Sequence, residues 1–301
     1  MYDNHSRGIS YIAGFFMLIA FTIAGLVVAG FISASVWQQM TGLKYEDLEK
    51  YLTNPAYANP LKIMQVINAV VGFLLPAVLT AKVLSNRPLG LLGLTSRIGA
   101  RQIGLVVLII GASLLVASSL SYFNQELPLP ADWKLKFEKM EATYNQQVEA
   151  IVSLKTGTDY LLALLIMAFL PALCEEALFR GGLQNFLSRG TGKPWLAIIV
   201  VSLLFSLAHI SFYGFLSRLF LGIILGALFH YSGRLWLSII GHFVHNAIAI
   251  TVMYVIIQKG TPMREAVKSD VGGWWGIVIL PVVIGLFVVF NRISVRDRRS
   301  D

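Results

Sequence analysis

The chain has 301 residues, of which 56% are hydrophobic and 13% charged, and its formal charge is +8. With a mean hydropathy of +0.70, this composition excludes an ordinary soluble globular protein and predicts an integral membrane protein. The positive charge does not indicate a nucleic-acid partner, because many basic residues lie in short connections, where contact with lipid headgroups explains them better. The single cysteine, Cys174, excludes an intrachain disulfide framework and a multi-cysteine zinc site.

Apolar stretches long enough to cross a bilayer recur along the whole chain. They lie at residues 9–37, 61–84, 102–123, 160–186, 194–212, 215–231, 235–257 and 274–290. The expected fold class is therefore all-α, a polytopic transmembrane helix bundle of about eight spans. No internal repeat or flexible linker divides the chain, so we expect residues 1–301 to form a single integral membrane domain.

Two connections interrupt the apolar pattern. Residues 43–60 are rich in charges, and residues 124–158 mix charges with apolar side chains such as Leu135 and Phe137. The second connection could form an amphipathic helix on the membrane surface. A solvated connecting helix is the plainer interpretation.

The basic residues of two short segments predict the topology. The 82–101 connection has no acidic residue, and both it and the C-terminal tail are expected to face the cytoplasm under the positive-inside rule. Their basic residues are Lys82, Arg87, Arg97, Arg101, Arg292, Arg296, Arg298 and Arg299. We expect the plasma (inner) membrane of a bacterium, with both termini inside and the active site facing the cytoplasm.

Two adjacent carboxylates stand out within the fourth apolar stretch. Glu175 and Glu176 are the only acidic residues between Asp159 and Glu265. One carboxylate at the centre of a bilayer costs about 2.5–3.5 kcal/mol on insertion scales, so two neighbours require partners, a wet cavity or altered protonation. Arg180 lies one helical turn after Glu176, which favours an ion pair between them. Glu175, rotated by about 100° from Glu176, is free to face a shared cavity.

Further polar groups lie in two later apolar stretches. Phe205 and His209 are four residues apart in the fifth stretch, and His242 and Asn246 are four apart in the seventh, so each pair shares a helix face. Taken alone, an intramembrane histidine is often only an interhelical hydrogen bonder, and Glu176 with Arg180 could be only a packing ion pair. The coincidence of polar groups on three helices favours a functional site.

This set of side chains suits the activation of water. A desolvated Glu175 could act as a general base, and His209 could orient the same water. His242 and Asn246 could donate hydrogen bonds to a carbonyl oxygen that gains negative charge. Together these groups predict hydrolysis of an amide.

The order of these residues resembles a known family. Glu175-Glu176-x-x-x-Arg180, Phe205-x-x-x-His209 and His242-x-x-x-Asn246 are similar to the motifs of the CPBP intramembrane proteases, also called the type II CAAX prenyl endopeptidase or abortive-infection family. The resemblance covers roughly residues 171–247, within an expected catalytic core at 160–257. It implies an all-helical membrane endopeptidase that cleaves a membrane-associated peptide or protein.

Carried over by position, the resemblance implies a role for each motif residue. Glu175 would activate water with His209 as its partner, and His242 and Asn246 would stabilise the oxyanion. The supporting residues would be Glu176, Arg180 and Phe205. The family's prenylated substrate is not carried over, since bacterial members need not meet prenylated proteins.

The use of a metal is the main mechanistic alternative. Glu175, His209 and His242 could supply three ligands to a zinc ion that holds a water. The HExxH motif is absent, and no acidic residue follows the histidines to accept a hydrogen bond from their rings and orient them. We therefore expect no metal and no other cofactor.

Two other function classes fit part of the pattern. The polar set could serve only for packing in a non-proteolytic scaffold or a regulator of partner membrane proteins. A proton-coupled transporter could also use buried Glu and His residues, but it predicts an inverted repeat, and no second Glu-rich span is present. A membrane endopeptidase is the leading hypothesis.

Overall fold

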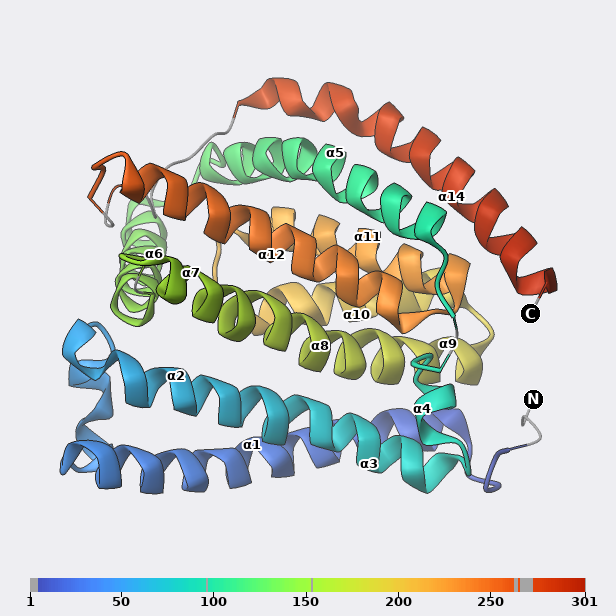
Figure 1. The fold of residues 1–301 in the computed structure, drawn as a ribbon, viewed down its shortest axis with the longest axis horizontal. Helices are drawn as coiled ribbons and strands as arrows, with labels where there is room; N and C mark the ends of the chain where they lie inside the picture. Colours follow the sequence, from blue (N-terminus) through green and yellow to red (C-terminus); the bar gives the residue numbers. More distant parts are fainter. Residues whose placement is uncertain (1–4, 96, 153, 263–264, 266–272, 301) are drawn as a thin grey trace.

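The computed structural model describes residues 5–95, 97–152, 154–262, 265 and 273–300, which form helices and no strand. Seven of these helices are long and apolar enough to cross a membrane. They are Tyr11–Thr41, Pro55–Leu84, Ala100–Gln125, Gly157–Thr191, Phe215–Ser232, Leu235–Gln258 and Trp274–Val295. The helices run side by side along one direction (Figure 1). The all-α polytopic bundle predicted from the sequence is confirmed.

The fifth expected span, at residues 194–212, is shorter than predicted. Helix α10 covers Pro194–Ala208, 15 residues, and ends before the expected boundary at residue 212. At 1.5 Å per residue it is about 22 Å long, less than the hydrocarbon core of about 30 Å. The apolar sequence continues to Phe212, but the backbone turns sharply at Ile210, where φ is 47°. His209 therefore caps the end of a short helix.

An N-terminal hairpin forms one side of the bundle. Helix α1 (Tyr11–Thr41) packs against a second rod made of α2 (Ala58–Ile67), a π-helical segment and α3 (Leu75–Leu84). The two rods touch at Gly25, where an added Cβ would lie 2.6 Å from the carbonyl oxygen of Val71. Small residues and apolar surfaces thus hold this hairpin together, as is common between membrane helices.

The fourth membrane-spanning segment, Gly157–Thr191, forms a central rod through the middle of the bundle (Figure 1). It contains α7 (Gly157–Ala163), α8 (Leu170–Glu176) and α9 (Asn185–Thr191), joined by π-helical segments at Leu164–Phe169 and Ala177–Gln184. π-Helical turns are rare in proteins overall, and those that do occur often lie at functional sites. The second of them begins directly after the Glu pair.

The remaining helices pack on the other side of this rod. These are α10, α11 (Phe215–Ser232) and α12 (Leu235–Gln258), with α5 (Ala100–Gln125) and α14 (Leu280–Ser300) outermost. Helices α10 and α11 approach closely at Gly222, where an added Cβ would lie 2.8 Å from the Cβ atom of Ser202. The site described below lies between the rod, α10, α11 and α12.

The long connection at 124–158 forms a helix, α6 (Ala131–Ile151), which stands across one end of the bundle (Figure 1). Most of its side chains are exposed, including Trp133 and Leu135 at 54% and 69%. Glu141 and Phe137 nevertheless contact the loop that follows His209. The helix is thus an outer element that also touches the site.

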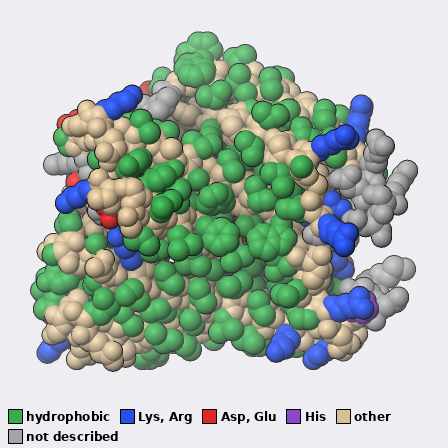
Figure 2. Space-filling view, viewed as in Figure 1, with side chains coloured by type: hydrophobic (Ala, Val, Ile, Leu, Met, Phe, Trp, Pro, Cys, Tyr) green, Lys and Arg blue, Asp and Glu red, His purple; other side chains and the backbone are tan. Residues whose placement is uncertain are grey.

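Both termini lie at the opposite end of the bundle from α6 (Figure 1). Figure 2 shows hydrophobic side chains over the middle of the visible face and Lys and Arg toward its two edges. The edge near the termini shows basic side chains without acidic ones, whereas the α6 edge shows both. Of the basic tail residues, the side chains of Arg296, Arg298 and Arg299 lie outside the described residues.

Candidate active site

The helical geometry of the central rod separates the two glutamates. Glu176 is completely buried, whereas the side chain of Glu175 is 16% exposed. Adjacent residues of a helix differ by about 100° in direction, so one carboxylate faces the packed interior and the other a less crowded side. The two carboxylates therefore lie in different surroundings, and the role predicted for Glu175 stays a prediction.

Glu176 is held by two donors at one oxygen. Its Oε1 accepts hydrogen bonds from Arg180 Nη1 at 2.6 Å and from His242 Nδ1 at 2.9 Å. The ion pair with Arg180 was predicted from their spacing, but the bond from His242 on α12 was not. Its other oxygen, Oε2, is buried without a hydrogen-bond partner among the described residues, so both donors meet at a single oxygen atom. Glu176 therefore joins the rod to α12.

Arg180 extends this network to a third helix. Its Nη2 donates to the carbonyl oxygen of Gly222 on α11 at 3.2 Å. Its guanidinium carbon lies 4.6 Å from the ring centroid of Phe205 on α10, a cation–π distance. The side chain is fully buried. Arg180 thus ties the position of Glu176 to both α10 and α11.

The ring of Phe205 is an apolar surface that contacts the polar groups of the site. Its ring meets His209 at a centroid distance of 4.8 Å and His242 at 5.8 Å, both edge-on, in addition to the Arg180 guanidinium. Phe179 of the rod contacts it edge-on at 5.2 Å. One buried ring therefore sets the positions of both histidines, which gives a physical reason for a phenylalanine four residues before His209.

A backbone bond orients the His209 ring. Its Nδ1 lies 2.8 Å from the carbonyl oxygen of Phe205. A carbonyl oxygen only accepts, so Nδ1 carries the hydrogen and donates it, and Nε2 is left with its lone pair. The half-buried ring interacts electrostatically with Glu175 and His242. Nε2 is therefore the atom of His209 that is available to a water or a substrate.

The loop after His209 is fixed from outside by two helices. Asn124 of α5 donates to the carbonyl oxygen of Phe212, and Ser211 donates to Glu141 of α6 at 2.8 Å. Phe212 also stacks on Phe137 of α6, with ring centroids 4.1 Å apart. Ile210 is the one non-glycine residue with positive φ among the described residues. A β-branched residue in this conformation is strained, and such strain is concentrated at functional sites.

Glu175 presents an unsatisfied oxygen to His242. Its Oε2 is buried and has no hydrogen-bond partner among the described residues. His242 Nε2 lies 4.0 Å away, too far for a direct hydrogen bond. A gap of this size suits an oxygen atom that bridges the two groups. The His242 ring thus stands between the two glutamates, with Nδ1 on Glu176 and Nε2 toward Glu175.

Asn246 lies one turn after His242 on α12 and is half-buried. Among the described residues it makes no hydrogen bond, so its amide is not committed to the packing of the bundle. The structure therefore brings Glu175, Glu176, Arg180, Phe205, His209 and His242 together, with Asn246 adjacent on the same helix.

The sequence analysis missed Arg218 on α11. This side chain interacts electrostatically with His209 and His245, and its Nη1 is buried without a hydrogen-bond partner among the described residues. Its guanidinium lies 5.7 Å from the Tyr144 ring of α6. No spacing in the sequence links Arg218 to the three motifs, because only the packing of α11 brings it near His209.

The described side chains include no group of three His, Cys, Asp or Glu residues arranged to hold a metal ion. One argument made from the sequence against zinc does not hold, however. Both histidines have partners at Nδ1, a glutamate for His242 and a carbonyl oxygen for His209. Such partners are what orients metal-bound histidines, and they equally orient histidines that bind water. The acidic partner comes from another helix, which sequence spacing does not reveal.

Comparison with known proteins gives one match. The family model described as type II CAAX prenyl endopeptidase Rce1-like matches residues 157–248. This segment runs from the start of α7 to the middle of α12 and contains all three motifs. No curated protein and no solved structure matches the chain.

Proposed function

Over residues 157–248 the chain is an Rce1-like, CAAX-type intramembrane protease, a hydrolase acting on peptide bonds, and from this premise we propose which residues carry out the hydrolysis. The family resemblance predicted from the sequence is thereby confirmed. The observation that carries the assignment is that Glu175, unlike Glu176, accepts no hydrogen bond from a described residue and holds its buried Oε2 4.0 Å from His242 Nε2. Residues 160–257 as the catalytic core remain a prediction, which the matched segment largely overlaps.

In the proposed first step, Glu175 activates a water molecule. The carboxylate accepts one proton of the water while the water oxygen attacks the carbonyl carbon of the scissile peptide bond. His209 Nε2 accepts a hydrogen bond from the second proton and orients the attack. The hydrogen bond from His209 Nδ1 to the Phe205 carbonyl supports this role, because it leaves the Nε2 lone pair available.

In the same step, the carbonyl oxygen becomes an oxyanion near α12. We assign its stabilisation to His242 Nε2 and the Asn246 amide. Since Glu176 already accepts the Nδ1 hydrogen, His242 donates from Nε2 only when the ring carries both protons. The proton held by Glu175 then passes to the leaving nitrogen as the C–N bond breaks, which restores the carboxylate.

We propose that this reaction needs no metal. The carboxylate and two oriented histidines are sufficient to activate water and to stabilise the oxyanion. Metal analysis of the purified protein, combined with activity after chelation, tests the proposal. Stoichiometric zinc that is lost together with activity would contradict it.

The chain is an integral membrane protein, and a CAAX-type protease acts on membrane-associated proteins. We propose that the substrate is a membrane-associated protein or peptide whose cleaved bond reaches the depth of Glu175, in the plasma membrane of a bacterium. A prenyl group on the substrate is not part of the proposal.

The side from which substrate enters depends on the orientation of the bundle. The termini and α6 lie at opposite ends of the bundle. If the termini are cytoplasmic, as the positive-inside rule predicts, a site that opens at the α6 end cannot also open to the cytoplasm. Leu135 on α6 and Leu89 on α4 (Pro88–Leu91) are both exposed. In a Cys174→Ala background, Leu135→Cys that a membrane-impermeant thiol reagent labels on intact cells would place the termini inside. Labelling of Leu89→Cys instead would place the α6 end inside.

The decisive experiment compares membrane proteomes of cells with wild-type protein and with Glu175→Gln. New C-termini that disappear in the variant are expected, because the amide cannot accept the proton of water. Glu138→Gln on α6 is the control, since Glu138 is exposed and lies outside the three motifs. If the two Glu variants give the same peptides as wild type, the general-base role is wrong and a non-proteolytic scaffold is favoured.

A further inference from the structure

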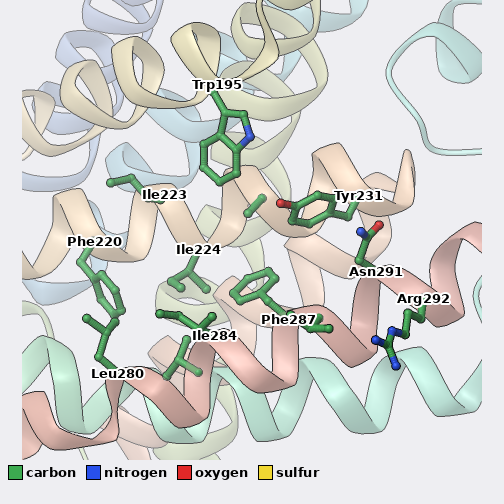
Figure 3. Close-up of a pocket in the computed structure, with 13 residues that line it drawn as sticks. Trp195, Phe220, Ile223, Ile224, Tyr231, Leu280, Ile284, Phe287, Asn291 and Arg292 are labelled. Carbon is green, nitrogen blue, oxygen red and sulfur yellow. The ribbon is translucent and has the colours of Figure 1, made fainter.

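A second feature of the bundle lies away from the Glu175 site. It is a groove between α10, α11 and α14 with a volume of about 390 Å³. Figure 3 shows the side chains that line it. They include Trp195 on α10, Phe220, Ala227 and Tyr231 on α11, and Ile284 and Arg292 on α14. None of them belongs to the three motifs.

The groove is open toward the bilayer. Ile284 and Val288 on α14 are 57% and 47% exposed, and Trp195 on α10 is 47% exposed. Ala227 on α11 is buried among the lining residues, and its small side chain leaves depth between the two helices. Since α10, α11 and α14 are apolar helices of a membrane bundle, the medium at this opening is lipid.

The length of the groove matches one leaflet of a bilayer. Along α11 it extends from Phe220 to Tyr231, eleven steps of 1.5 Å or about 16 Å. The hydrocarbon core of a bilayer is about 30 Å thick, so one leaflet is about 15 Å. The groove therefore has the reach of one acyl chain that enters from one membrane face.

One end of the groove is polar and basic. Asn291 and Arg292 lie at the same end as Tyr231, while Phe220 and Leu280 lie at the other (Figure 3). Arg292 is exposed and has no ion pair with a described side chain, and no acidic residue lines the groove. Tyr231 pairs with the Trp195 ring at a centroid distance of 6.4 Å, an aromatic pair of the kind found at headgroup level.

We propose that this groove binds an anionic phospholipid, with one acyl chain along α11 and α14 and the phosphate at Arg292. An apolar trough of leaflet length that ends at an exposed cation is complementary to such a lipid and not to a water-soluble ligand. Lys193, which directly precedes α10, is exposed and adds a second positive charge near Trp195. The proposal is independent of peptide hydrolysis, because the groove shares no residue with the Glu175 site.

Native mass spectrometry of the full chain in detergent tests the proposal, with phosphatidylglycerol or phosphatidylcholine added separately. Wild-type protein is expected to retain one phosphatidylglycerol. Arg292→Gln should lower that occupancy about fivefold, the effect of one basic residue near a membrane surface. Ile284→Trp should lower it by filling the groove, and since Ile284 is largely exposed the fold should tolerate the change.

Matched variants control for charge and for size. Arg101→Gln removes an exposed cation at the same end of the bundle as Arg292. Its neighbour Gln102 donates a hydrogen bond to Ser294 of α14, which places Arg101 at that end. Val282→Trp adds the same ring to α14 at a residue that is 52% exposed and does not line the groove. Both controls should retain the lipid as wild type does.

Three results would overturn the proposal. In the first, the groove variants bind phosphatidylglycerol as the controls do. In the second, phosphatidylcholine binds as well as phosphatidylglycerol, and Arg292→Gln does not change its occupancy. Alternatively, Ile284→Trp could abolish peptide cleavage or dissolve a dimer while lipid occupancy stays unchanged. That result would assign the groove to substrate or to a second copy of the chain.

Discussion

The N-terminal hairpin and the catalytic core of this bundle are held together by different physical means. In the hairpin, α1 meets α2 and α3 through glycines and apolar side chains, as at Gly25. In the core, one carboxylate oxygen of Glu176 collects donors from two helices, and Arg180 links the rod to α11. Apolar packing contacts tolerate small shifts of the helices. A buried ionic network tolerates them less, because a charged group that loses its hydrogen-bond partner is destabilising. Substitutions in the two regions should therefore separate stability from activity.

The largest expected effect is on stability and comes from Arg180→Leu. Removal of the guanidinium leaves Glu176 buried without its charge partner, which should lower the free energy of unfolding by about 3–5 kcal/mol. Unfolding in mixed micelles measures it. Arg101→Leu on α5, where the arginine is exposed and no hydrogen bond or ion pair joins it to a described side chain, is the control and should cost about 0–1 kcal/mol.

A second substitution sharpens the interpretation of Arg180. The double variant Glu176→Gln/Arg180→Leu removes both charges, and the amide oxygen can still accept the His242 Nδ1 hydrogen. It should recover most of the lost stability. If it remains as unstable as Arg180→Leu alone, the ion pair does not explain the effect.

The next effect, from Phe205→Leu, is on activity. The ring supports His209, His242 and Arg180, so a smaller side chain of similar polarity lets both histidines move. A displacement of about 1 Å can cost about 100-fold in rate. The loss in kcat/KM should greatly exceed the loss in stability, which is expected below about 1.5 kcal/mol.

Phe186→Leu is the matched control for the Phe205 prediction. Phe186 is also fully buried, but its ring pairs with Tyr11 of α1 and touches neither histidine. The same change in size should cost similar stability and leave kcat/KM unchanged. Equal losses of activity in the two variants would contradict the role assigned to Phe205.

The hairpin should show the opposite pattern. In Gly25→Ala, the new Cβ would lie 2.6 Å from the Val71 carbonyl oxygen and 2.9 Å from Pro76, so backbone must shift. Overpacking of this kind costs about 1–3 kcal/mol. The unfolding midpoint should fall while kcat is retained. Gly30→Ala in the same helix, with nothing within 4 Å of the added Cβ, should retain kcat and keep or slightly raise the unfolding midpoint.

The fold could be predicted from the sequence as far as the lengths of the apolar stretches determine it. The long spans and the helix at residues 131–151 follow from composition and periodicity, but the end of α10 does not. Apolar residues continue to Phe212, whereas contacts from Asn124 and Glu141 hold residues 210–214 out of the helix. A pattern within one segment cannot contain a boundary that other helices impose.

The site was readable where its partners share a helix. The Glu176–Arg180 pair follows from four-residue spacing and is confirmed. The bond from His242 to Glu176 and the approach of Arg218 to His209 join residues that are far apart in the chain, so spacing gave no signal. The roles of Glu175, His209, His242 and Asn246 stay predictions for the experiments above.

The smallest expected effect tests whether the strained turn after His209 contributes to the rigidity of the core. Ile210→Gly removes the strain of φ 47°, about 1–3 kcal/mol, against about 0.5–1 kcal/mol for the added freedom of glycine. Since Ile210 is 73% exposed, little packing is lost, and stability should stay equal or rise slightly. Activity should fall, because the more flexible loop no longer fixes the His209 ring. Ile210→Asn, which accepts positive φ with less freedom, should retain activity; a loss equal to that of the glycine variant would mean that the isoleucine side chain matters and not the turn.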